Sequence, residues 1–464
     1  MKFKYTEDIL RSLITRDSEV TPIKDILEWI DELNNSTYVR LTKISLDECS
    51  GWELNDKGVI QNDLGTFFKI SGLRSKINDD LVEQPILLQE EIGFLGIICK
   101  KIDGVYHFLM QAKIEPGNIN KIQISPTLQA TKSNFKQKHG GRKPKYLEFF
   151  ENAKEYEILY DQIQSEQSAR FLGKRNRNIV IDVGETDVLV EKNWKWMTLG
   201  QIKELLNYDN LVNMDTRTVL SGLPIFVEEC EAKPSWFNDQ LLFNSLKDSN
   251  IDYISRIYNY INDFKMFNDV TRQTIDLRKL RDWEFTETEI RHIDDYNFKV
   301  VFYEMEIEGR EVKKWHQPLF EAIGIAKFIL VTTVIDNKMM FLVKATYEPG
   351  AFDLMELGPS LQKEANDKTI SNELEKLILS RVENNTNITR DVMLSEEGGR
   401  FYHEENRNII LDIEFETLEK YLNDLDGYFL VDFSTLNRLM RVNNVLNIQL
   451  RNLLSLIDIK KEKK

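Results

Sequence analysis

A long internal repeat is the feature that most restricts how this chain can fold. Trp52 and Trp283 lie 231 residues apart, a spacing that also relates the apolar face of one helical segment in each half. A Gln-Pro pair at 84–85 and a Glu-Pro-Gly triplet at 115–117 recur 233 residues later, and Asn-Arg-Asn at 176–178 recurs after 230. So small a drift over about 150 positions predicts two homologous domains. We place them at 1–232 and 233–464.

Both halves repeat the same order of expected elements. Two apolar, β-favouring runs in each half flank a turn pair, which is Asp103-Gly104 in the first and Asp336-Asn337 in the second. The runs are 85–100, 105–114, 325–335 and 339–347. Amphipathic patterns predict helices at 146–167, 199–206, 216–223, 236–246 and 371–382. Because strands and helices come in blocks, we expect an α+β fold of mixed sheets with flanking helices.

Charge and composition exclude several classes of protein. The 464 residues are 42% hydrophobic, which is enough apolar material for packed cores. A net charge of −15 gives no protein-wide basic footprint for nucleic acid. We see no signal peptide and no apolar run of the roughly 20 residues that a spanning helix needs. Three widely spaced cysteines fit a reducing compartment, so we expect a soluble, cytoplasmic protein without membrane contact.

The common cofactor and metal motifs are missing from the sequence. Neither a dinucleotide-binding glycine pattern nor a P-loop occurs, and no Gly-x-Ser-x-Gly elbow is present. The five histidines show no metal-ligand spacing, and the cysteines form no cluster with them. We therefore expect neither a cofactor nor a protein-bound metal.

Polar residues crowd into the segment 110–141, which also contains the end of an apolar strand. Lys113 and Glu115 are two residues apart, so both should face the same side of the sheet. The surrounding Gln, Ser and Thr side chains would suit sugar hydroxyls and phosphate oxygens. The alternatives are a polar surface loop and an ion pair that merely closes the strand end.

A basic run follows at 173–178, with the sequence Gly-Lys-Arg-Asn-Arg-Asn. It could be a solvated turn, or it could clamp a diphosphate, since arginine binds phosphate oxygens in a bidentate way. The second half lacks these features, because Thr346 stands at the repeat position of Lys113 and Glu404 at that of Lys174. This difference predicts a working first pocket and a degenerate second one.

At these motifs the chain resembles the NDP-hexose 2,3-dehydratase family. The resemblance covers nearly the whole length. Its most specific stretches are QAKIEPGNINKIQISPTLQATKSNF, the run at 171–178, NMDTRTVLSGLP at 213–224 and SEEGGRFYHEENRN at 395–408. It implies two Nudix-like domains from a gene duplication, a homodimer, and dTDP-4-keto-6-deoxy-D-glucose as substrate. The Nudix metal-binding box is found in neither half, which agrees with a lyase rather than a hydrolase.

The implied reaction abstracts the C3 proton and expels the C2 hydroxyl, so it needs a base, an acid and an oxyanion stabiliser. We expect Lys113 and Glu115 to form the acid/base pair, in either order, with the Lys113 ammonium group as an alternative enolate stabiliser and His139 in reserve. The other expected substrate contacts are Trp52, Phe68, Gln84, Gln111, Thr127, Gln129, Thr131, Asn134, Lys174, Arg175 and Arg177. A downstream NADPH-dependent 3-ketoreductase is the expected pathway partner. The alternatives are a non-catalytic nucleotide-sugar-binding protein and a metal-dependent hydrolase.

Overall fold

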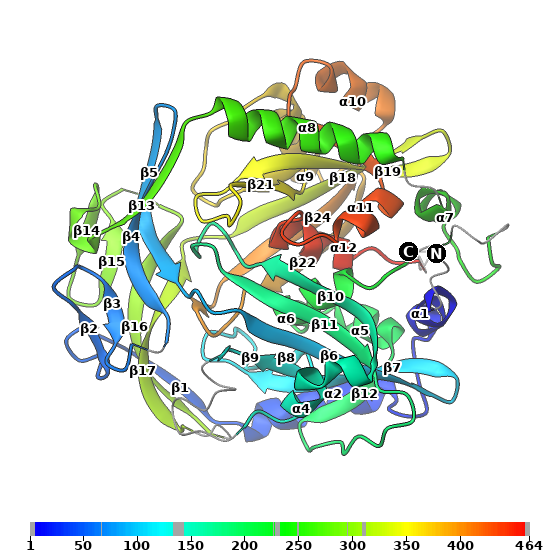
Figure 1. Ribbon diagram of the computed structural model, residues 1–464, viewed down its shortest axis with the longest axis horizontal. Helices are drawn as coiled ribbons and strands as arrows, with labels where there is room; N and C mark the ends of the chain where they lie inside the picture. Colours follow the sequence, from blue (N-terminus) through cyan, green and yellow to red (C-terminus); the bar gives the residue numbers. More distant parts are fainter. Residues whose placement is uncertain are drawn as a thin grey trace.

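Helices and strands both contribute to the fold, which is described by a computed structural model (Figure 1). The structure describes residues 5–65, 67–132, 143–225, 227, 233–247, 250–294, 296–308 and 312–459. These residues form four sheets, two of seven strands and two smaller ones, with helices packed around them. The expected α+β class with mixed sheets and flanking helices is confirmed.

The first seven-stranded sheet has the order β10-β11-β6-β7-β12, with β8 also paired to β7 and β9 to β6. Its strands are β6 (Gly93–Ile102), β7 (Val105–Ile114), β8 (Ile122–Ser125), β9 (Leu128–Ala130), β10 (Glu157–Ser165), β11 (Arg175–Asp182) and β12 (Trp194–Met197). Only β11 and β6 run parallel among these pairs. Asp103 and Gly104 have positive φ values of 51° and 76°, as a tight hairpin requires.

The second seven-stranded sheet has the equivalent order β22-β24-β18-β19-β25, with β20 paired to β19 and β21 to β18. Its strands are β18 (Ala326–Ile335), β19 (Lys338–Tyr347), β20 (Met355–Gly358), β21 (Leu361–Lys363), β22 (Ile388–Ser395), β24 (Glu405–Asp412) and β25 (Tyr428–Asp432). Here β18 and β24 are the parallel pair, and the hairpin turn at Asp336 and Asn337 again has positive φ. The predicted hairpins are therefore confirmed in both halves.

The two smaller sheets exchange a strand between the halves. In the five-stranded sheet, β13 (Val270–Ile275) of the second half pairs with β4. In the six-stranded sheet, β1 (Val39–Ile44) of the first half pairs with β16. The remaining strands are β2 (Trp52–Leu54), β3 (Ile60–Asn62), β4 (Lys69–Ile77), β5 (Asp80–Leu88), β14 (Trp283–Phe285), β15 (Glu289–His292), β16 (Phe298–Ile307), β17 (Lys314–Ala322) and β23 (Phe401–Tyr402). Each half thus completes a sheet of the other.

Amphipathic helices cover the sheets with their apolar faces. They are α1 (Thr6–Ile14), α2 (Ile23–Ser36), α4 (Leu147–Glu151), α5 (Leu199–Leu205), α6 (Met214–Ser221), α7 (Gln240–Lys247), α8 (Ile251–Phe267), α9 (Glu373–Glu383), α10 (Phe415–Leu422), α11 (Phe433–Leu439) and α12 (Ile448–Ser455), with short 3₁₀ turns η1 (Ala153–Glu155) and η2 (Leu277–Lys279). Ile26 and Ile30 of α2 and Ile257 and Ile261 of α8 are buried, as the repeated pattern predicts. Among the described residues, none of the helices combines the length and apolar character needed to cross a membrane.

The predicted helix at 146–167 is wrong. The segment contains only the short α4 and η1, and its second part is β10, which pairs along its length with β11. Pairing with β11 outweighs the local helical pattern, because it satisfies the backbone hydrogen-bonding groups of β10 and buries Leu159 and Tyr160. The predicted strand at 85–100 is likewise two strands, β5 and β6, which belong to different sheets.

Two buried arginines join the halves in the core. Arg217 on α6 is 1% exposed and donates to the Ser395 carbonyl of the second half at 2.6 Å. Arg451 on α12, also 1% exposed, donates to the Ser165 carbonyl of the first half. α6 and α12 pack against each other, so these bonds cross the interface in both directions. Loss of either bond would leave a buried guanidinium with one acceptor fewer.

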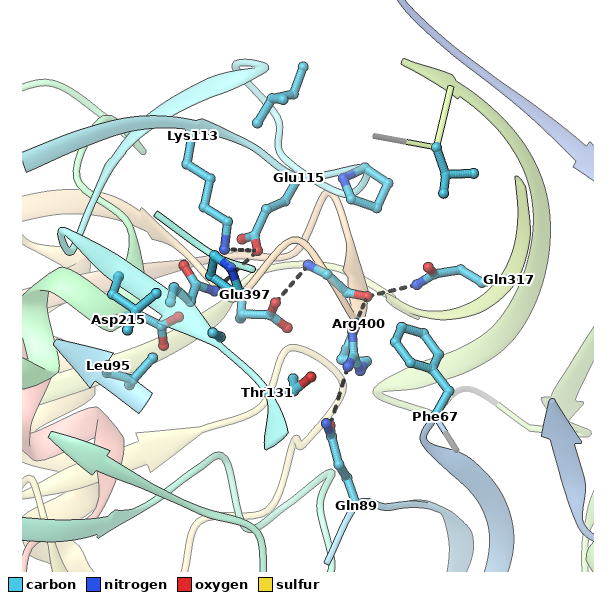
Figure 2. Close-up of a pocket in the computed structure, with 18 of the residues that line it drawn as sticks. Phe67, Gln89, Leu95, Lys113, Glu115, Thr131, Asp215, Gln317, Glu397 and Arg400 are labelled. Atoms are coloured by element: carbon cyan, nitrogen blue, oxygen red, sulfur yellow. Dashed lines mark hydrogen bonds and ion pairs between the residues drawn. The ribbon is translucent and has the colours of Figure 1, made fainter. Parts of the chain in front are cut away.

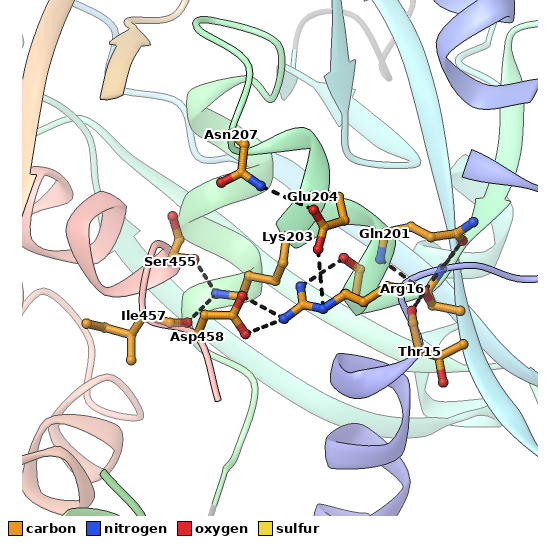
Figure 3. A network of polar contacts seen from close by, with 11 residues as sticks. Thr15, Arg16, Gln201, Lys203, Glu204, Asn207, Ser455, Ile457 and Asp458 are labelled. Atoms are coloured by element: carbon orange, nitrogen blue, oxygen red, sulfur yellow. Dashed lines mark hydrogen bonds and ion pairs between the residues drawn. The ribbon is translucent and has the colours of Figure 1, made fainter. Parts of the chain in front are cut away.

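A polar network also ties the N-terminal region to the C-terminal region (Figure 3). Arg16 forms an ion pair with Asp458 at 2.6 Å and a longer one with Glu204 at 3.4 Å. Lys203 on α5 donates to the carbonyls of Ser455 and Ile457, the latter at 2.8 Å. Burial lowers the pKa of Lys203 to about 8, although Asp458 opposes this shift.

Candidate functional site

A cavity of about 1150 Å³ lies where the first seven-stranded sheet meets segments of the second half. Its first-half wall comes from the end of β7, from β9 and from the loop before β11. Its second-half wall comes from β17 and from the turn between β22 and β23. The side chains shown in Figure 2 converge on this space from both halves.

The end of β7 carries an ion pair into the cavity. The ammonium group of Lys113 lies 3.0 Å from Glu115 Oε1, and both side chains are mostly buried. Gln129 on β9 donates to the same carboxylate oxygen at 3.1 Å. The prediction that Lys113 and Glu115 face the same side is therefore confirmed, and Figure 2 shows both pointing toward the centre of the site.

The second half contributes Glu397 and Arg400, which the sequence analysis did not identify. The backbone amide of Gly399 donates to Glu397 Oε1 at 3.1 Å. Arg400 donates to Gln89 Oε1 at 3.3 Å, and its guanidinium lies 4.4 Å from the ring centroid of Phe68. Burial raises the pKa of Glu397 to about 8, Glu115 adds to this shift, and Arg400 and Lys113 oppose it.

Contact between two turns holds Glu397 in place. The amide of Gly117 donates to the Gly398 carbonyl at 2.7 Å, and the amide of His403 donates to the Gly117 carbonyl at 2.8 Å. A Cβ atom at Gly117 would collide with the Phe401 carbonyl oxygen, so only glycine permits this approach. The Glu-Pro-Gly triplet of the first half thus serves as the docking point for the turn of the second.

Two further ionisable groups line the cavity. Asp215 on α6 is 2% exposed, and burial raises its pKa well above the ordinary value, with Glu166 and Glu397 adding to the effect. Lys174 donates to the Glu91 carbonyl at 2.6 Å, and burial lowers its pKa to about 8. The site therefore holds an acid, Glu397, and a base, Lys174, whose pKa values both lie near 8. In the described parts of the chain, no three His, Cys, Asp or Glu side chains are grouped so as to hold a metal ion.

Most of the predicted substrate contacts do line this cavity. They are Trp52, Gln111, Thr127, Gln129, Thr131 and Lys174. Trp52 Nε1 donates to the His316 carbonyl at 2.8 Å, which fixes its ring in the wall. The hydroxyl of Thr127 is used by the backbone, since it donates to the Leu109 carbonyl and accepts from the amide of Ile98. Thr127 therefore positions β9 instead of offering its hydroxyl to a ligand.

Four predicted contacts lie elsewhere. Phe68 is 1% exposed and belongs to the core, and its neighbour Phe67 lines the cavity instead. Gln84 is buried and bonded to the Ala169 carbonyl and to Tyr296, on the side of the second half's equivalent site.

Arg175 and Arg177 are the other two. Arg175 stacks on Phe352 at 3.6 Å, and Arg177 forms a bidentate pair with Asp161 at 2.7 and 2.6 Å. Side chains alternate along the start of β11, so Lys174 and Asn176 reach the cavity and the two arginines point away from it. Asn134 and His139 lie outside the described residues.

The equivalent site of the second half keeps the frame but lacks the lysine of the ion pair. Glu348 accepts from Gln362 at 3.1 Å, as Glu115 does from Gln129. Thr346 replaces Lys113, so the ion pair is gone. Arg170, the counterpart of Arg400, forms an ion pair with Glu364 at 3.4 Å.

Comparisons with known proteins identify the family of the chain. A family model described as NDP-hexose 2,3-dehydratase matches residues 23–223 and 254–457. A dTDP-4-dehydro-6-deoxy-alpha-D-glucopyranose 2,3-dehydratase of Streptomyces violaceoruber is 34% identical over 92% of this chain and 95% of its own length. Enzymes of the same name from Saccharopolyspora spinosa and Amycolatopsis orientalis are 33% and 31% identical over 97% and 98% of this chain, and over 94% of each relative.

Among solved structures, an ADP compounds hydrolase aligns with 35% of this chain and 85% of its own length, at 12% identity and a TM-score of 0.22. The full-length matches define an enzyme of the sugar-nucleotide lyase class. The chain belongs to the NDP-hexose 2,3-dehydratase family, which confirms the resemblance seen in its motifs.

Proposed function

We propose that this enzyme removes water from dTDP-4-keto-6-deoxy-D-glucose and forms dTDP-3,4-diketo-2,6-dideoxy-D-glucose. The observation that carries the assignment is the Lys113–Glu115 pair, 3.0 Å apart in the wall of a large cavity. A carboxylate beside a fixed ammonium group is what proton removal next to a carbonyl requires. The cavity volume exceeds the roughly 300–1,000 Å³ of common ligand sites, which leaves room for a nucleotide as well as a sugar.

The reaction needs no net oxidation. A base removes the C3 proton, and the electron pair is shared with the C4 carbonyl as an enolate. That pair then forms the C2–C3 double bond while the C2 hydroxyl leaves as water with the electrons of the C–O bond. The resulting enol loses its hydroxyl proton and gains a proton at C2, which gives the 3,4-diketo product.

In this scheme Glu115 removes the C3 proton and Lys113 stabilises the enolate. Gln129 keeps the carboxylate oriented, and Gln111 and Thr131 contact sugar hydroxyls from the same wall. Lys174 contributes positive charge toward the diphosphate. The reserve role of His139 stays a prediction.

We also propose that the chain arose by duplication of a Nudix-like domain, with halves at 1–232 and 233–464. The equal strand order of the seven-stranded sheets and the two matched segments, 23–223 and 254–457, support this proposal. The first half then carries the working pocket and the second a degenerate one. The homodimer, the 3-ketoreductase partner and the cytoplasmic location stay predictions.

The test is incubation with dTDP-4-keto-6-deoxy-D-glucose without added metal or nicotinamide, followed by mass spectrometry. Loss of one water is the expected result, and a parallel tube with a 3-ketoreductase and NADPH traps the unstable diketo product. Binding with intact substrate would favour a non-catalytic sugar-nucleotide-binding protein. Magnesium-dependent release of dTMP would favour a hydrolase.

A further inference from the structure

Glu397 is an acid of the first site that the second site lacks and that the proposed mechanism has not yet used. Glu397 lies in the turn of the second half that enters the first cavity. The repeat spacing of 230 that relates Arg170 to Arg400 makes Gln167 its counterpart at the second site. The frames around the two positions match, because Gln317 donates to the Gly399 carbonyl at 2.7 Å as Gln84 does to the Ala169 carbonyl. At this position, therefore, a carboxyl group is present only in the first site, which also holds the Lys113–Glu115 pair.

The surroundings of Glu397 place its carboxyl group among the reactive side chains. Figure 2 shows it directly beside the Lys113–Glu115 pair, with Arg400 on its other side. One carboxylate oxygen accepts from the amide of Gly399, which fixes the side chain against the turn. The turn itself is held by the bond from the Gly117 amide to the Gly398 carbonyl. Glu397 and Glu115 therefore enter the same space from opposite halves.

We propose that Glu397 is the general acid that protonates the departing C2 hydroxyl. This inference rests on the proposed function. The O–H bond of the Glu397 carboxyl breaks as its proton moves to the C2 oxygen, and the C2–O bond breaks to release water. Glu115 has by then gained the C3 proton. The proton that Glu397 gives up is thus balanced by the one that Glu115 takes, and no external reactant is needed.

The charges around Glu397 keep it suited to this task. Lys113 faces it from the end of β7 and Glu115 from the residue after that strand. Glu166 faces it from just after β10, Asp215 from α6, and Arg400 from its own turn. Burial and the neighbouring carboxylates raise its pKa to about 8, so it carries a proton at neutral pH. A protonated carboxyl beside an ionised one divides the acid and base roles between the two.

Asp215 is the competing acid, and its burial argues against it. Both residues line the cavity, but Asp215 is only 2% exposed, whereas Glu397 is partly exposed. The second site carries Gln449 at the position of Asp215, so the repeat alone does not separate the two candidates. The variants Glu397→Gln and Asp215→Asn do separate them.

The experiment follows the breaking of the C3–H bond and of the C2–O bond in one sample. The substrate dTDP-4-keto-6-deoxy-D-glucose is incubated in D₂O, C3 exchange is followed by proton NMR, and water loss is followed by mass spectrometry. Glu397→Gln should keep C3 exchange within about threefold of wild type while water loss falls by about 10²–10⁴-fold. Water loss near the wild-type rate, or loss of both signals in a folded variant, would overturn the proposal. The proposal would also be overturned if Asp215→Asn, and not Glu397→Gln, kept C3 exchange while its rate of water loss fell.

Glu356→Gln is the matched control. Glu356 is also buried, its pKa is raised to about 8, and it accepts from Ser165 outside the cavity. Its counterpart in the first half is already a glutamine, Gln123, which bonds to Ser395 at 2.9 Å. The control should therefore fold and should change neither signal.

A second measurement uses the unmodified enzyme and does not depend on the folding of a variant. Water loss should decline as the pH rises through about 8, because Glu397 loses its proton, while C3 exchange should not decline with it. Parallel decline of both signals would overturn the assigned role. Absence of water loss by the wild-type chain at every pH would instead overturn the proposed function, which keeps the two failures distinct.

Discussion

Lys113 and Glu115 meet because a strand repeats the direction of its side chains every two residues. That rule could be applied to the sequence alone, and the 3.0 Å ion pair agrees with it. The same rule explains Lys174 and Asn176, which line the cavity, and Arg177, which does not. The sequence showed the basic run but not where the strand begins, so it could not say which of its members face the ligand.

Replacing Lys113 by Met or Glu115 by Gln should lower kcat by about 10²–10⁴-fold, since each change removes one partner of the proton transfer. The Michaelis constant should change much less, because most of the cavity wall is untouched. Steady-state kinetics of water loss measure both. Lys43→Met is the matched control, since Lys43 forms a comparable pair with Glu289 at 2.6 Å on the surface. Near-normal turnover in both site variants would contradict the assignment.

At the scale of elements, local sequence signals correctly predicted the two hairpins but wrongly predicted one long helix. The turn pairs at 103–104 and 336–337 specify their own backbone shape, so the strands on either side could be placed from sequence. The segment 146–167 carries a helical apolar pattern, yet its second part becomes β10, because pairing with the next strand, β11, lies outside the window in which the pattern was read. Glu397 was missed for a similar reason, since its role depends on contact between turns of different halves.

The turn-to-turn contact gives a prediction about a single methyl group. Gly117→Ala should lower the free energy of unfolding by about 1–3 kcal/mol, because the added Cβ meets the Phe401 carbonyl oxygen and the turns must separate. Urea denaturation measures this loss. Gly350→Ala is the matched variant, since its Cβ would meet the Phe171 carbonyl oxygen at the second site.

The two glycine variants should differ in activity under conditions where both stay folded. Gly117→Ala should reduce turnover more than Gly350→Ala, since only the former displaces the turn that carries Glu397. Equal turnover in the two variants, or unchanged stability of Gly117→Ala, would argue against the docking role of this triplet.

At the scale of the whole molecule, buried carboxylates make stability depend on pH. Burial raises the pKa of several of them to about 7 or 8 from an ordinary value near 4.5. They are Glu348, Glu356, Glu396, Glu397 and Glu404. Between these values the folded chain binds more protons than the unfolded chain, so the free energy of unfolding falls as the pH rises. His107 and His403 oppose this trend below pH 6.5, their ordinary pKa, because burial lowers their pKa.

We therefore expect the melting temperature to fall by several degrees between pH 6 and pH 8, as measured by calorimetry, since about 1 kcal/mol corresponds to about 2 °C in larger domains. Glu356→Gln should flatten this dependence by removing one titrating group. Above pH 8 the trend should weaken, because Lys174 and Lys203 have a lowered pKa near 8 and favour the folded state as they lose protons. A constant or rising melting temperature between pH 6 and pH 8 would contradict the prediction.

The repeat predicted two similar halves, but it could not predict that they trade β1 and β13. The local sequence of a strand is the same whether the strand pairs within its own half or with the other half, as in domain swapping. This exchange has a consequence for synthesis on the ribosome. β1 emerges about 250 residues before its partner β16, which is a wait of tens of seconds at about 5–20 residues per second. The nascent first half must therefore carry β1 unpaired until the second half arrives, so the gene cannot be divided between two separately released polypeptides without leaving β1 without its partner strand.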